Sequence, residues 1–161
     1  MSEKWILAPV FILAFMTFAV ALWLLKCRIV AVKQGLNPSY FVFNGGTKIP
    51  AFLQQAEQHY VNLFEMPILF YVGCLVAYSS HTVTMLGVLL AWAYVLSRMM
   101  HTYIHLTNNK LRMRRNAFMA SYIVLFAFWI WLAMGIFRKY CLVCFSTFSA
   151  RKIGNSAQLV S

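Results

Sequence analysis

Acidic residues are almost absent from this 161-residue chain: it has no aspartate, and three glutamates stand against 14 lysines and arginines. Glycine and proline are also scarce, with seven and four residues. Charged residues make up 11% of the chain, whereas soluble domains contain about 25%. Apolar residues make up 62%, and the mean hydropathy is +0.71. This composition excludes a disordered chain, a coiled coil and an ordinary soluble enzyme, and it predicts an integral membrane protein.

The net charge of +11 would suit a nucleic-acid partner, but the positions of the charges do not. Lysines and arginines occur in short clusters between long apolar runs, as topology signals and lipid-headgroup contacts do. We therefore expect membrane lipids, and no nucleic acid, among the partners.

The apolar runs predict an all-α protein with four membrane-spanning helices, since about 20 apolar residues cross a bilayer. The expected spans are residues 5–25, 60–78, 83–106 and 117–137, in one domain over residues 1–137. A signal peptide is the alternative interpretation of the first run, but the apolar core of this run is longer than that of a signal peptide. Residues 34–58 are expected to form a loop that lies partly at the membrane interface. Residues 138–161 are expected to form a basic and polar tail that is partly disordered beyond Arg151.

The lysine and arginine clusters also predict how the chain crosses the membrane. The segment between the first two spans contains Lys26, Arg28, Lys33 and Lys48, and the segment between the last two contains Lys110, Arg112, Arg114 and Arg115. The segment between the second and third spans contains none. By the positive-inside rule, both basic segments are cytoplasmic and both termini are outside.

Ionisable residues inside a span are costly, so each is a functional candidate. Glu65 and Arg98 enter the membrane from the same side at similar depths. We expect them to pair, within one chain or across an interface, or to face a shared polar cavity. A purely structural ion pair is the alternative.

A polar stripe follows the third span towards the cytoplasm. Its members are spaced 3-4-3-4-3 along the chain, which predicts one face of a helix: Arg98, His101, His105, Asn108, Arg112 and Arg115. Asn62 and Glu65 share a face of the second span in the same way. We interpret these faces as the lining of a site for an anionic, thiol-containing ligand, because arginine binds carboxylates and favours a thiolate.

Two alternatives to this interpretation arise from the histidines and cysteines. His101, His105 and Glu65 could be zinc ligands, but the H-E-x-x-H motif is absent, and we expect no metal. Cys141 and Cys144 form a C-x-x-C motif, which keeps a membrane thiol oxidoreductase as an alternative function.

Two segments resemble the MAPEG family, the membrane-associated proteins in eicosanoid and glutathione metabolism. Residues 58–72, QHYVNLFEMPILFYV, are similar to its second-helix signature, and residues 98–115, RMMHTYIHLTNNKLRMRR, resemble the bacterial form of its third helix. The resemblance implies a left-handed four-helix bundle assembled as a homotrimer in a bacterial inner membrane. It further implies glutathione as a co-substrate, bound between subunits near the cytoplasmic face.

The resemblance also assigns roles to individual residues. Arg112 matches the arginine that stabilises the glutathione thiolate, and the glutathione-binding positions are Arg28, Gln58, Asn62, Glu65, Arg98, His101 and His105. Gln58 departs from the family, which has arginine there, and the two histidines replace tyrosines. The implied activity is a glutathione transferase or peroxidase acting on lipophilic electrophiles. A non-enzymatic trimer that binds a lipid or anionic ligand is the alternative that Gln58 favours.

Overall fold

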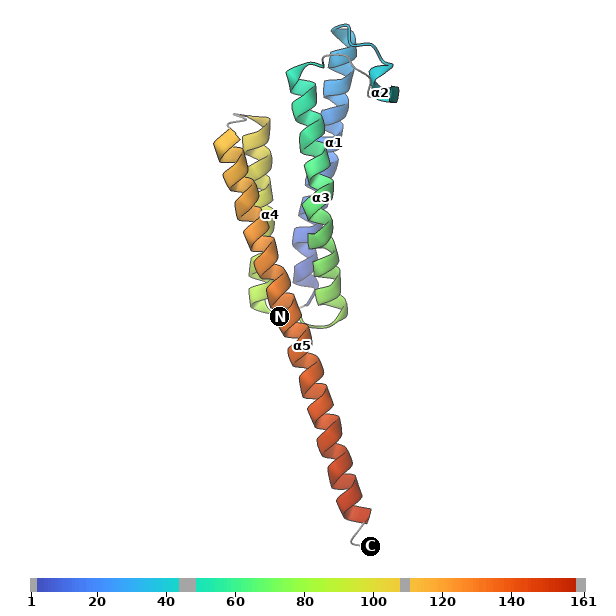
Figure 1. The fold of residues 1–161 in the computed structure, drawn as a ribbon, viewed down its shortest axis with the longest axis vertical. Helices are drawn as coiled ribbons and strands as arrows, with labels where there is room; N and C mark the ends of the chain where they lie inside the picture. The colour runs from blue at the N-terminus through green and yellow to red at the C-terminus, as the bar shows by residue number, and fades with distance from the viewer. Residues whose placement is uncertain (1–2, 44–48, 108–110, 159–161) are drawn as a thin grey trace.

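The chain folds into long antiparallel helices (Figure 1). The computed structural model describes residues 3–43, 49–107 and 111–158, with the main chain alone for residues 43, 111 and 142–158. A short 3-10 helix η1 (Glu3–Ile6) is followed by α1 (Leu7–Lys33), α2 (Tyr40–Phe43), α3 (Ala51–Ser79), α4 (Met85–Leu106) and α5 (Leu111–Gln158). The described residues contain no strand, and the predicted all-α membrane bundle is confirmed.

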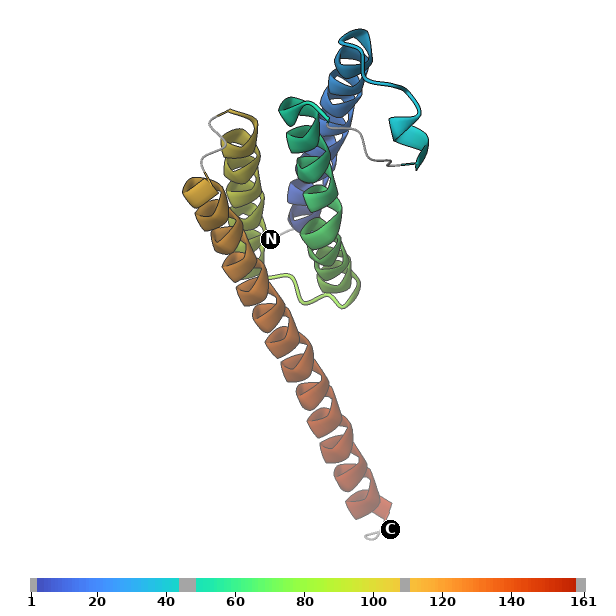
Figure 2. The ribbon, with the colours of Figure 1, turned by 45° about the horizontal axis from the view of Figure 1, so that its top comes forward.

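The four long helices run alternately up and down (Figures 1 and 2). Helix α1 packs mainly against α3, and α4 packs mainly against α5. We call the end where α1 and α4 finish and α3 and α5 begin the loop end. The opposite end, where residues 80–84 connect α3 to α4, is the turn end. Both predicted basic segments therefore join helices at the loop end.

Three helical segments are long and apolar enough to cross a membrane: Glu3–Lys33, Ala51–Ser79 and Arg112–Cys141. Helix α4, the third predicted span, is not among them. Arg98, His101 and His105 lower the apolarity of its second half. Helix α4 nevertheless packs between the other helices, so its polar side chains face protein rather than lipid.

The second long helix begins at Ala51, so the prediction of a loop through residue 58 was wrong. Leu53 and Ala56 extend the buried face of α3 towards its start, and both pack against α1 side chains such as Leu24 and Ala31. Pro50 occupies the N-cap position of α3, and the helix runs without interruption from Ala51.

Partial disorder was predicted beyond Arg151; α5 continues to Gln158, well beyond the bundle (Figure 1), and residues 159–161 lie outside the described residues. No proline follows Pro67 in the sequence, and alanine, lysine and arginine in the tail favour a helix.

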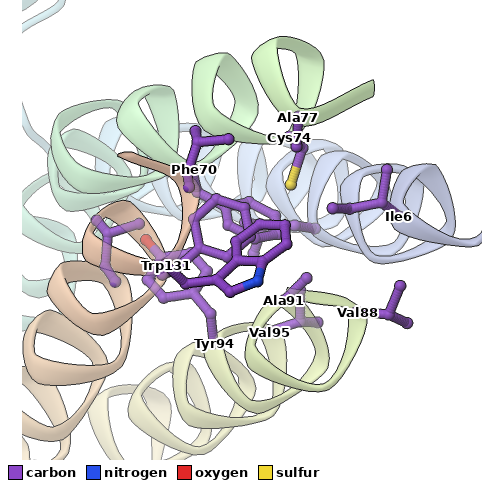
Figure 3. Close-up of a cluster of buried hydrophobic side chains, with 13 residues drawn as sticks. Ile6, Phe70, Cys74, Ala77, Val88, Ala91, Tyr94, Val95 and Trp131 are labelled. Carbon is purple, nitrogen blue, oxygen red and sulfur yellow. The ribbon is translucent and has the colours of Figure 1, made fainter. Parts of the chain in front are cut away.

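An aromatic core fills the turn end of the bundle (Figure 3). The ring centroids of Phe70 and Tyr94 are 4.6 Å apart, and those of Phe128 and Trp131 are 5.4 Å apart. These rings come from α3, α4 and α5. The outer faces are apolar as well, as exposed Phe15 and Phe137 illustrate, and they suit contact with lipid or with other subunits.

Candidate functional site

A cluster of buried polar side chains lies between α3, α4 and α5 near the loop end. His59 from α3 and His101 and His105 from α4 are at most 2% exposed, and we call these three residues the histidine cluster. The ring centroids of His59 and His105 are 4.6 Å apart, and His101 lies 6.0 and 5.9 Å from them. Arg98 is fully buried one turn deeper along α4.

Arg98 connects this cluster to the predicted glutathione-binding face of α3. Its Nη2 donates to the main-chain carbonyl of Asn62 at 2.8 Å, and its guanidinium lies 5.9 Å from the ring centroid of Phe118. The arginine therefore fixes the backbone of α3 where Asn62 and Glu65 project from it.

The expected ion pair between Glu65 and Arg98 does not form within one chain. Glu65 is exposed on the outer side of α3, although its carboxylate is near enough to act electrostatically on Arg98. Among the described residues, Glu57 forms an ion pair with Arg28, and the Glu3 carboxylate lies 2.9 Å from Nδ1 of His81. The reason is geometric: the Asn62 carbonyl faces α4 and accepts from Arg98, whereas the Glu65 side chain points away.

The polar stripe is not one continuous helix face, which corrects the sequence prediction. Helix α4 ends at Leu106 and α5 begins at Leu111, so the 3-4 spacing is broken between them. Arg112 and Arg115 are exposed on α5, and Asn108 lies outside the described residues. Arg114 has the inward position instead, and its Nη1 donates to His105 Nε2 at 3.4 Å.

Gln58, Asn62 and Glu65 lie along an α3 face that a single chain leaves open. Gln58 and Glu65 are exposed and Asn62 is half-buried, while His59 on the adjacent face is fully buried. Sequence reasoning missed His59. Its position four residues before the apolar Leu63 places both residues on one helix face, and this spacing was a usable signal. It also missed Gln55, whose side chain donates to the His105 carbonyl and ties the start of α3 to the end of α4.

Arg28, a predicted glutathione-binding residue, is engaged in a second polar group at the loop end. Its Nη2 lies 3.1 Å from Glu57 Oε1, and the Tyr40 hydroxyl donates to Glu57 Oε2 at 3.3 Å. The Arg28 guanidinium also lies 5.3 Å from the ring centroid of Phe41. Burial and the Glu57 carboxylate raise the pKa of Tyr40. These contacts hold α2 against α1 and α3.

Several buried polar atoms in the cluster have no hydrogen-bond partner among the described residues. They include both ring nitrogens of His59 and of His101, and Nε and Nη1 of Arg98. Buried polar atoms in proteins are nearly always hydrogen-bonded, so this arrangement is suited to hold water or a polar ligand. Within the described residues, no group of three or more His, Cys, Asp or Glu side chains is arranged to hold a metal ion.

The C-x-x-C motif lies on α5 beyond the aromatic core. Cys141 is an exposed free thiol, and the side chain of Cys144 lies outside the described residues. The thiol oxidoreductase alternative thus stays a prediction.

Comparison with known proteins adds one finding. The family model for the MAPEG family matches residues 6–134, from η1 to the part of α5 that packs in the bundle. A search of curated proteins found no match.

Proposed function

The chain belongs to the MAPEG family, and from this premise we propose that it is a membrane glutathione transferase or peroxidase acting on lipophilic electrophiles. Glutathione binds on the open α3 face, and Gln58, Asn62, Glu65, Arg98, His101 and His105 make up or support its site. Arg28 borders the site at the loop end.

The observation that carries this proposal is the pairing of an open polar face with a fully buried arginine behind it. Glu65 is exposed within the predicted span of residues 60–78, where a lipid neighbour would leave it without a partner, and Gln58 is exposed two turns closer to the loop end. Arg98 is anchored on the Asn62 carbonyl and has two further donor atoms without partners among the described residues. A tripeptide with two carboxylates, an amine and two peptide groups supplies complementary hydrogen bonds.

A neighbouring subunit completes such a site. The open face of α3 is flanked by large exposed apolar side chains, including Val61, Phe64 and Ile68. Burial of this surface against a second and third copy gives a homotrimer with a cleft at each interface. The electrophile enters each cleft laterally from the lipid. The loop end is cytoplasmic in a bacterial inner membrane, which gives the site access to glutathione.

Arg112 stabilises the reactive form of the co-substrate. The thiol of glutathione loses its proton to water, and the positive guanidinium favours the resulting thiolate. The thiolate sulfur then forms a bond to the electrophilic carbon as the leaving group departs with its electron pair. Exposure of Arg112 on the single chain agrees with a role at an interface. Arg114 acts differently, since it contacts His105 inside the bundle.

The test is thiolate formation on purified protein in detergent, followed by stopped-flow absorbance after glutathione is added. We expect a thiolate signal that saturates at millimolar glutathione or below. Arg112→Gln reduces the signal at neutral pH by at least about tenfold, whereas Lys26→Gln, which removes an exposed cation of α1, leaves it unchanged. Absence of any signal or binding up to millimolar glutathione would refute the proposal.

Gln58 favours the second candidate, a trimer that binds a lipid or anionic ligand without turnover. Glutamine hydrogen-bonds a carboxylate more weakly than a bidentate arginine. If the transferase proposal is right, Gln58→Arg tightens glutathione binding about tenfold. Unchanged, undetectable glutathione binding in this variant would favour the second candidate.

A further inference from the structure

A cavity of about 520 Å³ lies at the turn end, on the opposite side of the aromatic core from the histidine cluster. Residues 81–84, the first turn of α4 and the middle of α5 surround it. No predicted site residue lines it. Its walls combine cationic, hydroxyl and apolar side chains, among them Thr82, Thr84, Leu86, Trp131, Met134 and Lys139.

Specific contacts fix the walls of this cavity. Trp131 Nε1 donates to Thr84 Oγ1 at 3.1 Å, which holds the indole against the start of α4. A Cβ at Gly87 would lie 2.2 Å from ring atoms of Trp131, so only glycine leaves room for the indole there. At Gly135, by contrast, an added Cβ would meet only Thr82, at 3.6 Å. The cavity is therefore shaped on one side by Trp131 and open beside Gly135.

The charge of the cavity is positive. Arg138 and Lys139 line it, and the described lining residues include no acidic side chain. Lys139 Nζ donates to the Ser80 carbonyl at 2.6 Å, which leaves two ammonium protons for another acceptor. His81 also lines the cavity. Its Nδ1 lies 2.9 Å from the carboxylate of Glu3, which is not itself a lining residue.

The position of the cavity along the bundle matches the edge of a bilayer. Helix α3 ends at Ser79, and the uncharged run of α5, residues 116–137, ends at Arg138. Met134 lies one turn closer to the middle of the bundle than Arg138, and Leu86 lies in the first turn of α4. Both are more than half exposed. Cations thus stand at headgroup level above an apolar wall that continues towards the acyl chains.

We propose that this cavity binds an anionic phospholipid from the leaflet at the turn end. The phosphate lies at Arg138 and Lys139 with the Thr82 and Thr84 hydroxyls beside it. An acyl chain follows Leu86, Trp131 and Met134 into the bilayer. The apolar wall favours a lipid over free phosphate, because free phosphate has no acyl chain to contact it. The cations favour an anionic headgroup over a zwitterionic one. The inference is independent of glutathione binding at the loop end.

Native mass spectrometry of the full-length protein tests the proposal with phosphatidylglycerol and phosphatidylcholine of identical acyl chains. We expect the wild-type protein to prefer phosphatidylglycerol. The double variant Arg138→Gln/Lys139→Gln reduces its affinity for phosphatidylglycerol at least about tenfold and leaves phosphatidylcholine binding unchanged. Gly135→Phe, which places a ring in the cavity without a change of charge, weakens binding of both lipids.

The matched control is Lys26→Gln/Lys33→Gln, which removes two exposed cations of α1 and equals the test variant in charge. Equal loss of phosphatidylglycerol in the control and test variants would show a general charge effect and overturn the proposal. Equal affinity of the wild-type protein for the two lipids would also overturn it. Displacement of phosphatidylglycerol by millimolar inorganic phosphate would assign the site to free phosphate instead. Thermal denaturation of each variant verifies that it is folded.

Discussion

At the turn end, α3, α4 and α5 meet through the aromatic rings of Phe70, Tyr94 and Phe128, whereas at the loop end the same three helices meet through His59, Arg98 and Arg114. The turn end packs apolar surfaces closely, with Gly73 and Gly87 making room for the rings. Seven of the nine buried polar side-chain atoms that have no partner among the described residues lie at the loop end, and the other two are the Tyr94 hydroxyl and Trp129 Nε1. This difference separates the part of the bundle that stabilises the fold from the part that is suited to bind a ligand.

The largest effect is expected from Phe128→Ala at the turn end. The substitution leaves an apolar cavity among Phe70, Gly73 and Trp131. We expect the free energy of unfolding to fall by about 3 kcal/mol, measured by denaturant titration of the purified protein in mild detergent. Phe126→Ala, at an exposed position on α5, is the control and should have little effect.

Gly87→Ala should have the next largest effect. The new methyl group would overlap the Trp131 ring, and the displacement of this ring lowers stability by about 1 to 3 kcal/mol. Gly135→Ala is the matched control, because its Cβ makes only an ordinary contact and alanine favours the helix. Thermal unfolding compares the two variants. Equal stability of both would show that Trp131 is mobile and that the turn end is not closely packed.

A smaller effect is expected from His59→Phe in the histidine cluster. The ring is of similar size, and the substitution removes two buried nitrogens that lack partners among the described residues. We expect stability to stay unchanged or rise by up to about 1 kcal/mol, while glutathione binding weakens. The reverse exchange at the turn end, Phe70→His, should be clearly destabilising. A large loss of stability in His59→Phe would contradict the division between the two ends.

The smallest effect concerns the polar group that holds α2. Arg28 and Glu57 are partly exposed, so Glu57→Gln should lower stability by about 0.5 kcal/mol. The same substitution should lower the pKa of Tyr40, which the Glu57 carboxylate helps to raise. A raised pKa in the folded state favours the protonated phenol. Its contribution to stability is present below the ordinary value of 10.0 and is lost as the pH rises above it.

The titration of Tyr40 can be separated from that of the other tyrosines by subtracting the titration curve of a variant that lacks Tyr40. Ultraviolet titration of the wild-type protein and of Tyr40→Phe gives the Tyr40 component, and the same pair in the Glu57→Gln background gives its shift. No shift between the two backgrounds would mean that the Glu57 carboxylate does not reach the phenol in solution.

Much of the fold followed from local sequence, and the exceptions have physical causes. Long apolar runs predicted the helices because a membrane leaves few other ways to satisfy the backbone. The start of α3 was placed too late because Leu53 and Ala56 form a buried face only when α1 is beside them. The tail was expected to be partly disordered because of its polar residues, whereas α5 continues through a segment that contains no proline.

The candidate site was predicted less completely than the fold. The roles proposed for Arg112, Asn62 and Glu65 rest on family membership and stay predictions. The 3-4 spacing of polar residues continues from α4 into α5, so the spacing does not reveal that the helix ends between them. Spacing placed Arg112 in line with His105, but the reversal of the chain brings Arg114 to His105 instead.

The sequence by itself determined that this protein is a helical membrane bundle of the MAPEG family with polar groups at one end, because hydropathy, charge position and local motifs are properties of the chain. Only the tertiary structure decided which polar side chain meets which. It directed Arg98 to the Asn62 carbonyl rather than to Glu65, placed His59 beside His101 and His105, and formed a cationic cavity at the turn end. These contacts depend on how helices distant in sequence rotate and pack against one another, and a pattern along one helix does not contain that information.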